Sequence, residues 1–329
     1  MPANEPVLSY APNSAEKKRL KEVLAELKSS EVDVPMYIGS KEVRTGKKVA
    51  MHPPHETKHV LGYFHAGEEK HVQQAIEAAL TAKEGWAKTS WENRANIFLK
   101  AADLLATKYR PYINGTTMLG QSKNVFQAEI DAACELIDFL RFNVHFLSEI
   151  YKQQPISSPG VHNRMEYRPL EGFVLAVTPF NFTAIGGNLP TSAAMCGNVV
   201  VWKCANTQIY SAQMFMRILK EAGLPGGVIN LIYVDGPTIG RVCFNHRDFA
   251  GVHFTGSTAA GPGSAPTARS SACGTPHSKS SSAMNTRRAC CAGSRAACAG
   301  SQRGGDCRRT GSRRYDIAPR THGRCEAAG

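Results

Sequence analysis

The sequence contains no apolar run of the roughly 18 residues that a membrane-spanning helix needs. Its first residues, MPANEPVLSY, lack both the basic and the apolar segment of a secretory signal. The early Glu5 also argues against a transit peptide, because such peptides are poor in acidic residues. We therefore expect no membrane partner, and either a cytoplasmic protein or a protein of the mitochondrial matrix whose presequence is missing.

Two common phosphate-binding motifs are absent as well. Neither G-x-G-x-x-G nor G-x-x-x-x-G-K-[ST] occurs, which excludes the usual dinucleotide fingerprint and the P-loop. The sequence evidence for any nucleotide site must therefore come from less specific patterns. The composition is otherwise that of a globular protein, with 42% hydrophobic and 20% charged residues, and 329 residues are enough for two domains.

Residues 259–329 contain no leucine, valine, phenylalanine or tryptophan. They consist mostly of alanine, glycine, arginine, serine and cysteine, and their large apolar side chains belong to Met284, Tyr315 and Ile317. Such a composition buries too little surface to offset an ordering entropy of about 1–2 kcal/mol per residue. We expect this tail to be disordered. It carries most of the formal net charge of +12, so the charge of residues 1–258 is ordinary.

Three interpretations of this tail compete. We favour an out-of-frame or otherwise non-native translation of a GC-rich gene, because wrong-frame GC-rich codons give this composition. The second is a basic arm that binds nucleic acid, although Tyr315 is its only aromatic residue. The third is a metal or disulfide module, but the tail cysteines form no C-x-x-C pair. A nucleic-acid partner is therefore not favoured, and no metal site is predicted.

The N-terminal part of the chain is predicted to be mainly helical. In residues 15–30 leucine and valine recur with helical spacing, and Ser14 is placed to cap the helix. A short strand, MYIGS, follows at 36–40. Residues 68–150 show repeated apolar stripes, which we interpret as the packing faces of several helices. A connector rich in proline, serine and glycine follows at 153–163.

From Glu171 the pattern changes to short apolar runs separated by helix-like segments. Strands that alternate with helices in this way indicate a parallel sheet, and the lack of polar alternation indicates strands buried on both faces. Ligands of such sheets bind beyond the carboxyl ends of the strands, so the residues after each run are candidates. The four runs are 172–178, 198–203, 228–234 and 250–256.

Three of these strands are followed by residues that suit a nucleotide or a reacting carbonyl group. Gly256 permits close backbone approach, and Ser257 is placed to cap a helix whose free N–H groups would face a phosphate. Lys203 would reach a ribose hydroxyl or a phosphate, and Asn181 would donate a hydrogen bond to a developing oxyanion. Each also has a simpler interpretation, as a plain turn, a solvated charge and a helix cap.

Taken in order, the segments T-P-F-N-F, G-N-V-V-V-W-K, K-E-A-G-L-P-G-G-V-I-N and F-T-G-S-T resemble the aldehyde dehydrogenase superfamily. Within it the chain resembles the Δ1-pyrroline-5-carboxylate dehydrogenase branch, through GQSK at 120–123, QAEIDAACELIDFLRFN at 127–143 and LEGFVLAVTPFNFTAIGGN at 170–188. The resemblance covers nearly all of residues 3–258. It implies NAD-dependent oxidation of L-glutamate γ-semialdehyde, a small aldehyde, to L-glutamate in proline breakdown, and a homo-oligomer for the intact enzyme.

The resemblance also implies roles for single residues. Asn181 would supply the amide of the oxyanion hole, and Glu135 and Phe182 would line the substrate channel. Asn206 is neutral where NAD-preferring members often carry a carboxylate, so NADP would also be tolerated beside NAD. The residues implied to contact the cofactor are Thr178, Lys203, Asn206, Gly256 and Ser257.

Members of this family use a cysteine thiolate as nucleophile and a glutamate as base. The resemblance places these residues in an E-[LT]-G-G-K stretch and a later G-Q-x-C stretch, and neither stretch occurs in the sequence. The pair Cys290-Cys291 lacks the glycine and glutamine of that motif, and we interpret its likeness to it as coincidence. We therefore expect an inactive chain. The alternative function is a non-catalytic fragment that binds nucleotide or captures full-length subunits.

The expected fold is α/β and like that of aldehyde dehydrogenases, but truncated. N-terminal helices would precede a Rossmann-like parallel-sheet cofactor domain. Residues 1–258 would form this cofactor-binding part, with its parallel sheet within 171–258. Residues 259–329 would form the low-complexity basic tail.

Overall fold

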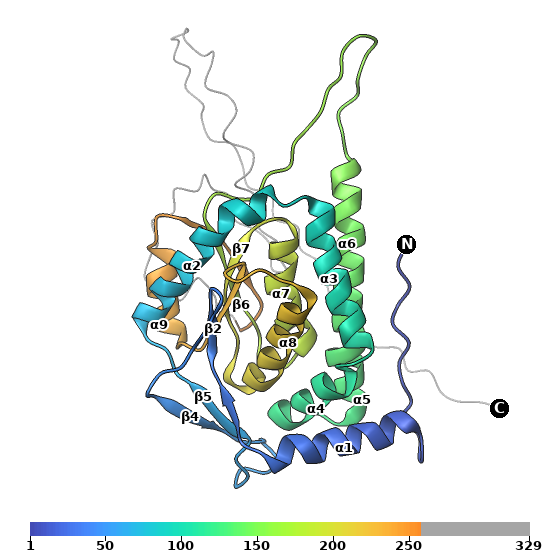
Figure 1. Cartoon of the computed structure of the whole chain (residues 1–329), viewed down its shortest axis with the longest axis vertical. Coiled ribbons are helices and arrows are strands. Elements are labelled where there is room, and N and C mark those ends of the chain that lie inside the picture. The colour runs from blue at the N-terminus through green and yellow to red at the C-terminus, as the bar shows by residue number, and fades with distance from the viewer. Residues whose placement is uncertain (258–329) are drawn as a thin grey trace, which may run out of the picture. The chain divides into compact units, whose positions relative to one another are not determined.

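Residues 1–257 are the part of the chain that the structure, a computed structural model, describes (Figure 1). The tail predicted at 259–329 lies outside these residues, and so does the boundary predicted after residue 258. The expected disorder of the tail and its three interpretations therefore stay predictions.

Helix α1 spans Ala15–Ser29, as its apolar spacing predicted. The Ser14 hydroxyl accepts a hydrogen bond from the backbone N–H of Lys17 at 3.4 Å and so caps the helix. The buried side of α1 packs against α4, Arg110–Gln121. Both the cap and the helix-packing interpretation of the apolar stripe are confirmed.

The run predicted to be helical at 68–150 is confirmed, with one difference. The structure places a π-helix over Glu129–Glu135 within this run, which the apolar stripes did not indicate. A π-helix holds one residue more per turn than an α-helix, so it changes which side chains share a face. The segments are α2 (Glu69–Lys88), α3 (Trp91–Ala106), α4, α5 (Val125–Ala128), the π-helix η1 (Glu129–Glu135) and α6 (Leu136–Lys152).

A six-stranded sheet in the order β3-β2-β8-β7-β6-β9 forms the centre of the described part. The four strands predicted from the apolar runs are parallel to one another, as expected. Two strands from the N-terminal part continue the sheet in antiparallel pairing beside β8, which makes it a mixed sheet. The strands are β2 (Met36–Ile38), β3 (Lys41–Val43), β6 (Phe173–Val177), β7 (Val199–Lys203), β8 (Ile229–Ile232) and β9 (Phe249–Phe254).

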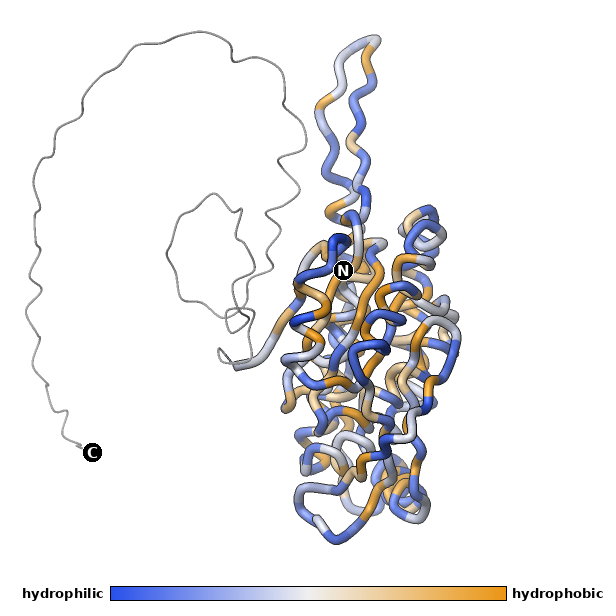
Figure 2. Tube along the Cα trace, turned by 90° about the vertical axis from the view of Figure 1, so that its left-hand side faces the viewer, coloured by the Kyte–Doolittle hydropathy of each residue, from blue (hydrophilic) through white to orange (hydrophobic). Residues whose placement is uncertain are grey.

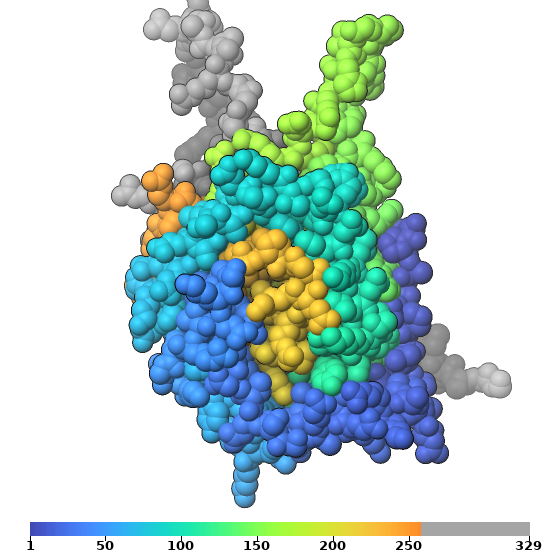
Figure 3. All heavy atoms as spheres, in the orientation of Figure 1, coloured from blue at the N-terminus to red at the C-terminus, as the bar shows by residue number. Residues whose placement is uncertain are grey.

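Helices cover both faces of this sheet (Figure 1). Helix α2 and α9 (Gly236–Phe244) pack together on one face. Helices α7 (Thr183–Met195) and α8 (Ile209–Ala222) cover the other face, with α3, α4 and α6 packed outside them. Figure 3 shows a gold surface patch, the colour of α8 in Figure 1, framed by N-terminal elements in blue and teal. Within residues 1–257 no helix combines the length and the apolar character needed to cross a bilayer.

The core lies between the sheet and α8. Trp202 of β7 is 1% exposed, and its ring meets Phe215 of α8 edge to face, with 6.5 Å between ring centroids. Phe173 of β6 is fully buried and meets Phe249 of β9 in the same way at 6.0 Å. These aromatic pairs lock α8 and the edge strand β9 onto the centre of the sheet.

Three features had no counterpart in the predictions or only a partial one: strand β3, a small second sheet and the arm after α6. A small second sheet joins β1 (Val32–Val34), β5 (Gly62–His65) and β4 (Lys48–Met51), and it was not predicted. The connector after α6 is confirmed as a long arm, residues 153–172, which extends away from the helices as two adjacent extended segments (Figures 1 and 2). A single isolated bridge joins Ser158 and Val161 on it.

In the turn that precedes β6, one added methyl group should clearly lower the stability of the fold. Gly172 has a φ of +107°, and a Cβ there would lie 1.9 Å from the Asp248 carbonyl oxygen. Gly172→Ala should therefore lower the free energy of unfolding by about 2 kcal/mol or more. Gly236→Ala is the control, because no described atom lies within 4 Å of its Cβ position. Urea unfolding of both variants checks this, and equal midpoints would contradict it.

Candidate functional site

The carboxyl ends of the four parallel strands lie level with one another. Val177, the last residue of β6, pairs with Lys203 of β7 on one side and with Phe254 of β9 on the other. Lys203 in turn pairs with Ile232, the last residue of β8. The predicted gathering of strand-end residues at one sheet edge is therefore present, and this carboxyl edge is the candidate site.

Thr178 begins the turn after β6, and its side chain is buried rather than open to a ligand. Its hydroxyl donates to the Gln208 side-chain oxygen at 3.3 Å and accepts a hydrogen bond from the Trp202 indole N–H at 3.3 Å. Its backbone N–H donates to the Lys203 carbonyl at 3.1 Å. Thr178 thus ties β6 to β7 and to the segment that precedes α8.

Lys203 and Asn206 lie at the same edge and are more accessible to a ligand than Thr178. Lys203 is half-buried at the end of β7, and Asn206 is exposed at the first position of the short 3-10 helix η2, Asn206–Gln208. On the neighbouring strand, Gly256 and Ser257 are exposed directly after β9. Ser257 is the last described residue, so the helix predicted to start there lies outside the described part.

Asn181 and Phe182 lie on the loop between β6 and α7, and both are exposed. We call residues 179–182 the α7-entry loop. Side chains from η2 fix its backbone: the Thr207 hydroxyl donates to the Phe180 carbonyl at 2.9 Å, and the Gln208 side-chain amide donates to the Phe182 carbonyl at 2.6 Å. The loop therefore has a defined backbone and leaves its two predicted functional side chains accessible.

Asp131 fixes the other end of this loop. Its two carboxylate oxygens accept hydrogen bonds from the backbone N–H groups of Thr183 and Ala184, each at 2.9 Å. A carboxylate at this place satisfies free N–H groups at the start of α7 and suits the positive end of the helix dipole. The Lys123 ammonium pairs with Asp131 at 2.6 Å and lies 4.6 Å from the centre of the Phe182 ring.

Sequence reasoning missed Asp131, Lys123 and Gln208 as parts of the site. No local pattern marks the contact of Asp131, because its partners on α7 follow 52 and 53 residues later. Lys123 stands in the GQSK segment that carried the resemblance, and this was its only signal. Gln208 lies two residues beyond Asn206, on a turn that the sequence pattern did not resolve.

Glu135, predicted to line a substrate channel, is half-buried at the end of η1. Burial raises the pKa of its carboxyl group, and the neighbouring charge of Asp131 raises it further, while Lys123 acts in the opposite direction. Glu135 is thus close enough to Asp131 and Lys123, beside the α7-entry loop, for their charges to affect its pKa.

A small cavity lies behind the α7-entry loop and not on the carboxyl edge itself. Its volume of about 10 Å³ is at the lower limit for a single water molecule, so it is no substrate pocket. The cavity is lined by Thr183, Gly186, Gly187, Trp202, Gln208, Ser211, Ala212 and Phe215.

The cysteines of the described part are not arranged as nucleophiles. Cys134, Cys204 and Cys243 are buried, and burial raises the pKa of each thiol to about 12. At neutral pH these groups are thiols, and the thiolate is the reactive form. Cys196 is exposed and lies near the end of α7, away from the loop that carries Asn181. No cluster of potential metal ligands occurs within residues 1–257.

Comparison with known proteins identifies the family to which the chain is similar. The family model "Aldehyde dehydrogenase family" matches residues 41–271. The "Probable delta-1-pyrroline-5-carboxylate dehydrogenase" of Schizosaccharomyces pombe is 49% identical over 258 residues, covering 78% of this chain and 47% of the relative. The Agaricus bisporus "Delta-1-pyrroline-5-carboxylate dehydrogenase" is 52% identical with the same coverage. The chain spans about half the length of the curated relatives it matches.

Solved structures of a Delta-pyrroline-5-carboxylate dehydrogenase are also similar to the chain. The crystal structure of the Mycobacterium tuberculosis Delta-pyrroline-5-carboxylate dehydrogenase has a TM-score of 0.77 and 51% sequence identity, with 79% of this chain and 48% of that chain covered. A second crystal structure of that protein, bound with NAD, gives the same TM-score and identity and covers 49% of that chain.

The raised pKa of Glu135 predicts a pH-dependent effect on stability. Its ionised form is disfavoured in the fold, so Glu135→Gln should raise the urea midpoint at about pH 7. Below the ordinary pKa of a glutamate both proteins are neutral at this position, so at about pH 3.5 the gain should vanish.

Glu149→Gln is the matched control on α6. The hydrogen bond from Lys152 lowers the pKa of Glu149, so this variant should lose a little stability at neutral pH. An equal shift of the midpoint for both variants, or a gain for Glu135→Gln that persists in acid, would contradict the assignment.

Proposed function

The chain belongs to the aldehyde dehydrogenase family, and we propose that residues 1–257 are the dinucleotide-binding part of a dehydrogenase for L-glutamate γ-semialdehyde. The observation that carries the proposal is identity of 49% and 52% to two Δ1-pyrroline-5-carboxylate dehydrogenases over 258 residues. The level carboxyl ends of β6, β7 and β9 supply the edge at which such a cofactor binds in parallel sheets. The proposed product is L-glutamate.

The accessible groups at this edge fit NAD. Lys203 offers a cation and Asn206 a neutral amide, which together suit the hydroxyl groups of the adenosine ribose. Gly256 and Ser257 offer exposed backbone N–H groups and a hydroxyl to the pyrophosphate. Thr178 would contribute through its position in the turn, because its hydroxyl is engaged within the protein. When bound, NAD would accept a hydride from the aldehyde carbon.

The α7-entry loop would serve the carbonyl group of the substrate. The Asn181 amide would donate a hydrogen bond to the carbonyl oxygen as negative charge develops there, a contribution of about 3 kcal/mol in comparable oxyanion holes. Phe182 would provide an apolar wall beside the aldehyde, and Glu135 a polar group farther along the channel. The fixed backbone of the loop supports this role, because donors act best when they need no rearrangement.

We further propose that the chain with this sequence does not complete the reaction itself. The sequence has neither the glutamate stretch nor the later cysteine stretch that members of the family use. The buried thiols of Cys134, Cys204 and Cys243 offer no substitute, because their pKa values lie near 12. This proposal makes the chain a nucleotide-binding fragment, and an out-of-frame origin of residues 259–329 remains part of it.

Assembly is proposed from exposed apolar side chains on the arm at 153–172, and compartment from the name of one relative. Ile156 is 91% exposed and Val161 54% exposed on the arm at 153–172, which supports a contact of this arm with a second copy. A homo-oligomer is therefore proposed for the intact enzyme. The Dictyostelium discoideum relative is named as mitochondrial, so we propose the mitochondrial matrix beside the cytoplasm as the compartment.

The proposal predicts binding of NAD without turnover. Calorimetric titration of the purified chain should detect NAD binding, and Lys203→Ala should weaken it about tenfold by removing a charge-assisted hydrogen bond. Lys88→Ala on α2 is the matched control and should leave the affinity unchanged, because Lys88 pairs with Glu84 on an exposed helix face. NADH absorbance should stay at the rate without protein when glutamate semialdehyde is added.

Two results would contradict the proposal in different ways. NADH formation above the rate without protein would show that the chain is active, against the proposed lack of turnover. Absence of NAD binding to a folded chain would contradict the proposed dinucleotide site itself. Equal affinities of Lys203→Ala and the unmodified chain would move the site away from the carboxyl edge.

A further inference from the structure

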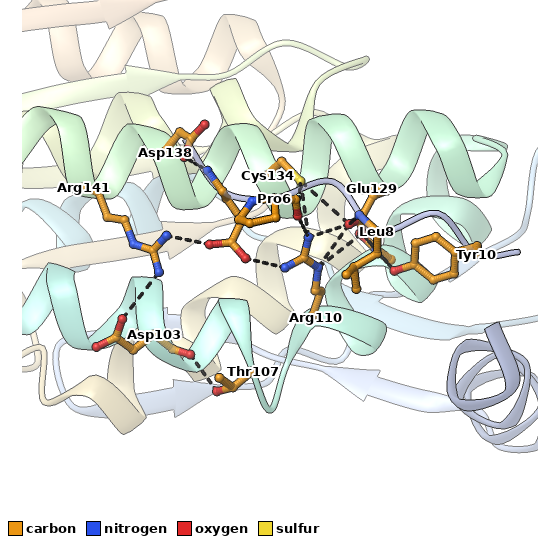
Figure 4. Close-up of polar contacts among 12 residues, drawn as sticks. Pro6, Leu8, Tyr10, Asp103, Thr107, Arg110, Glu129, Cys134, Asp138 and Arg141 are labelled. Atoms are coloured by element: carbon orange, nitrogen blue, oxygen red, sulfur yellow. Dashed lines mark hydrogen bonds and ion pairs between the residues drawn. The ribbon is translucent and has the colours of Figure 1, made fainter. Parts of the chain in front are cut away.

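The N-terminal residues 4–10, here called the N-terminal strap, run over the helices and bind a buried carboxylate. Glu129, the first residue of η1, is fully buried. Its carboxylate accepts hydrogen bonds from the Leu8 backbone N–H and from the Tyr10 hydroxyl, each at 2.8 Å (Figure 4). Asn114 of α4 donates a third at 2.8 Å. The strap therefore supplies two of the donors that hold the first residue of the π-helix.

Arginine side chains attach the rest of the strap (Figure 4). The Arg110 guanidinium is nearly buried, pairs with both Glu129 and Glu5, and donates to the Pro6 carbonyl at 2.6 Å. Arg141 of α6 binds the second oxygen of Glu5 at 2.6 Å. Burial works against the charge of Glu129, yet Arg110 and the other donors hold the pKa of its carboxyl group below the ordinary value. The contacts thus favour the ionised form of Glu129.

The same π-helix carries the carboxylate that fixes the α7-entry loop. Asp131 stands two residues after Glu129, is 3% exposed, and binds the first two N–H groups of α7. Between the two carboxylates only Ile130 intervenes, and the following Ala132 and Ala133 are fully buried. We expect a displacement of η1 at Glu129 to move Asp131, because the close packing of the buried alanines leaves the helix little room to absorb it.

We propose that Asp131 is a positioning residue for Asn181 and Phe182, and that the N-terminal strap holds Asp131 in place through Glu129 and η1. The strap then connects a segment near the start of the chain with a loop more than 170 residues later. The consequence for aldehyde binding rests on the proposed function. The mechanical coupling between strap and loop does not.

Backbone amide exchange, measured by NMR at constant pH, tests the first half of the proposal. Asp131→Asn keeps one acceptor oxygen and loses the pair with Lys123, so the Thr183 or Ala184 N–H should exchange about fivefold faster. The Asn181 and Phe182 amide resonances should shift with it. Asp235→Asn is the matched control, because Asp235 caps α9 through the Thr238 N–H at 2.9 Å. Because asparagine keeps the oxygen that accepts from Thr238, this control should leave exchange at Thr183, Ala184 and Thr238 unchanged.

Removal of residues 2–10, which include the whole strap, tests the second half. Without the strap, Thr183 and Ala184 should exchange about fivefold faster and the Asn181 resonance should move as in Asp131→Asn, while Thr238 exchanges at its original rate. If Thr238 also accelerates, the deletion has loosened the whole fold. Glu5→Gln then decides, since it weakens the Arg110 and Arg141 pairs and leaves the strap backbone intact.

Unchanged exchange at Thr183 and Ala184 in the folded strap variant would overturn the coupling. Unchanged exchange in Asp131→Asn would overturn the positioning role. Neither measurement needs NAD or aldehyde, so a failure here is distinct from a failure of the proposed function. A chain that binds no NAD would still show the predicted exchange pattern if the coupling holds.

Discussion

The in-register pairing of β6 with β7 and β9 is the constraint on which the candidate site depends. Because Val177 pairs with both Lys203 and Phe254, the turns that follow three separate strands start at the same level. Thr178 strengthens this arrangement, since its backbone and side chain join β6, β7 and the turn after β7. A shift of one residue in either pairing would separate these turns and move each side chain of the shifted strand to the opposite face of the sheet.

Buried polar contacts from distant segments then shape that edge. Asp131 and Gln208 come from elements on either side of α7 in the chain, and both bind the backbone around the α7-entry loop. Each contact satisfies backbone groups that would otherwise be unpaired near the core, so fold stability and site geometry have the same cause here. The side chains of Asn181 and Phe182 do not hold the loop and remain exposed, because other residues hold their backbone.

The sequence predicted the features that have a local pattern. The cap at Ser14, the helical stripes and the four parallel strands were confirmed, because spacing and apolar runs encode them directly. The expected burial of all four strands was wrong for β9, which lies at the edge of the sheet and is only partly buried along its length. It did not predict the small sheet, whose strands have three or four residues, or the π-helix, which needs one extra residue in a helical pattern. Asp131 was missed because its contact with α7 depends on tertiary packing.

Amide chemical shifts recorded during an NAD titration would show whether the carboxyl edge binds the dinucleotide. We expect shifts at Lys203, Asn206, Gly256 and Ser257, with a smaller effect at Thr178. We expect none on the small sheet that contains β4 and β5. Shifts confined to the small sheet or to α1, or no shifts at saturating NAD, would contradict binding at this edge.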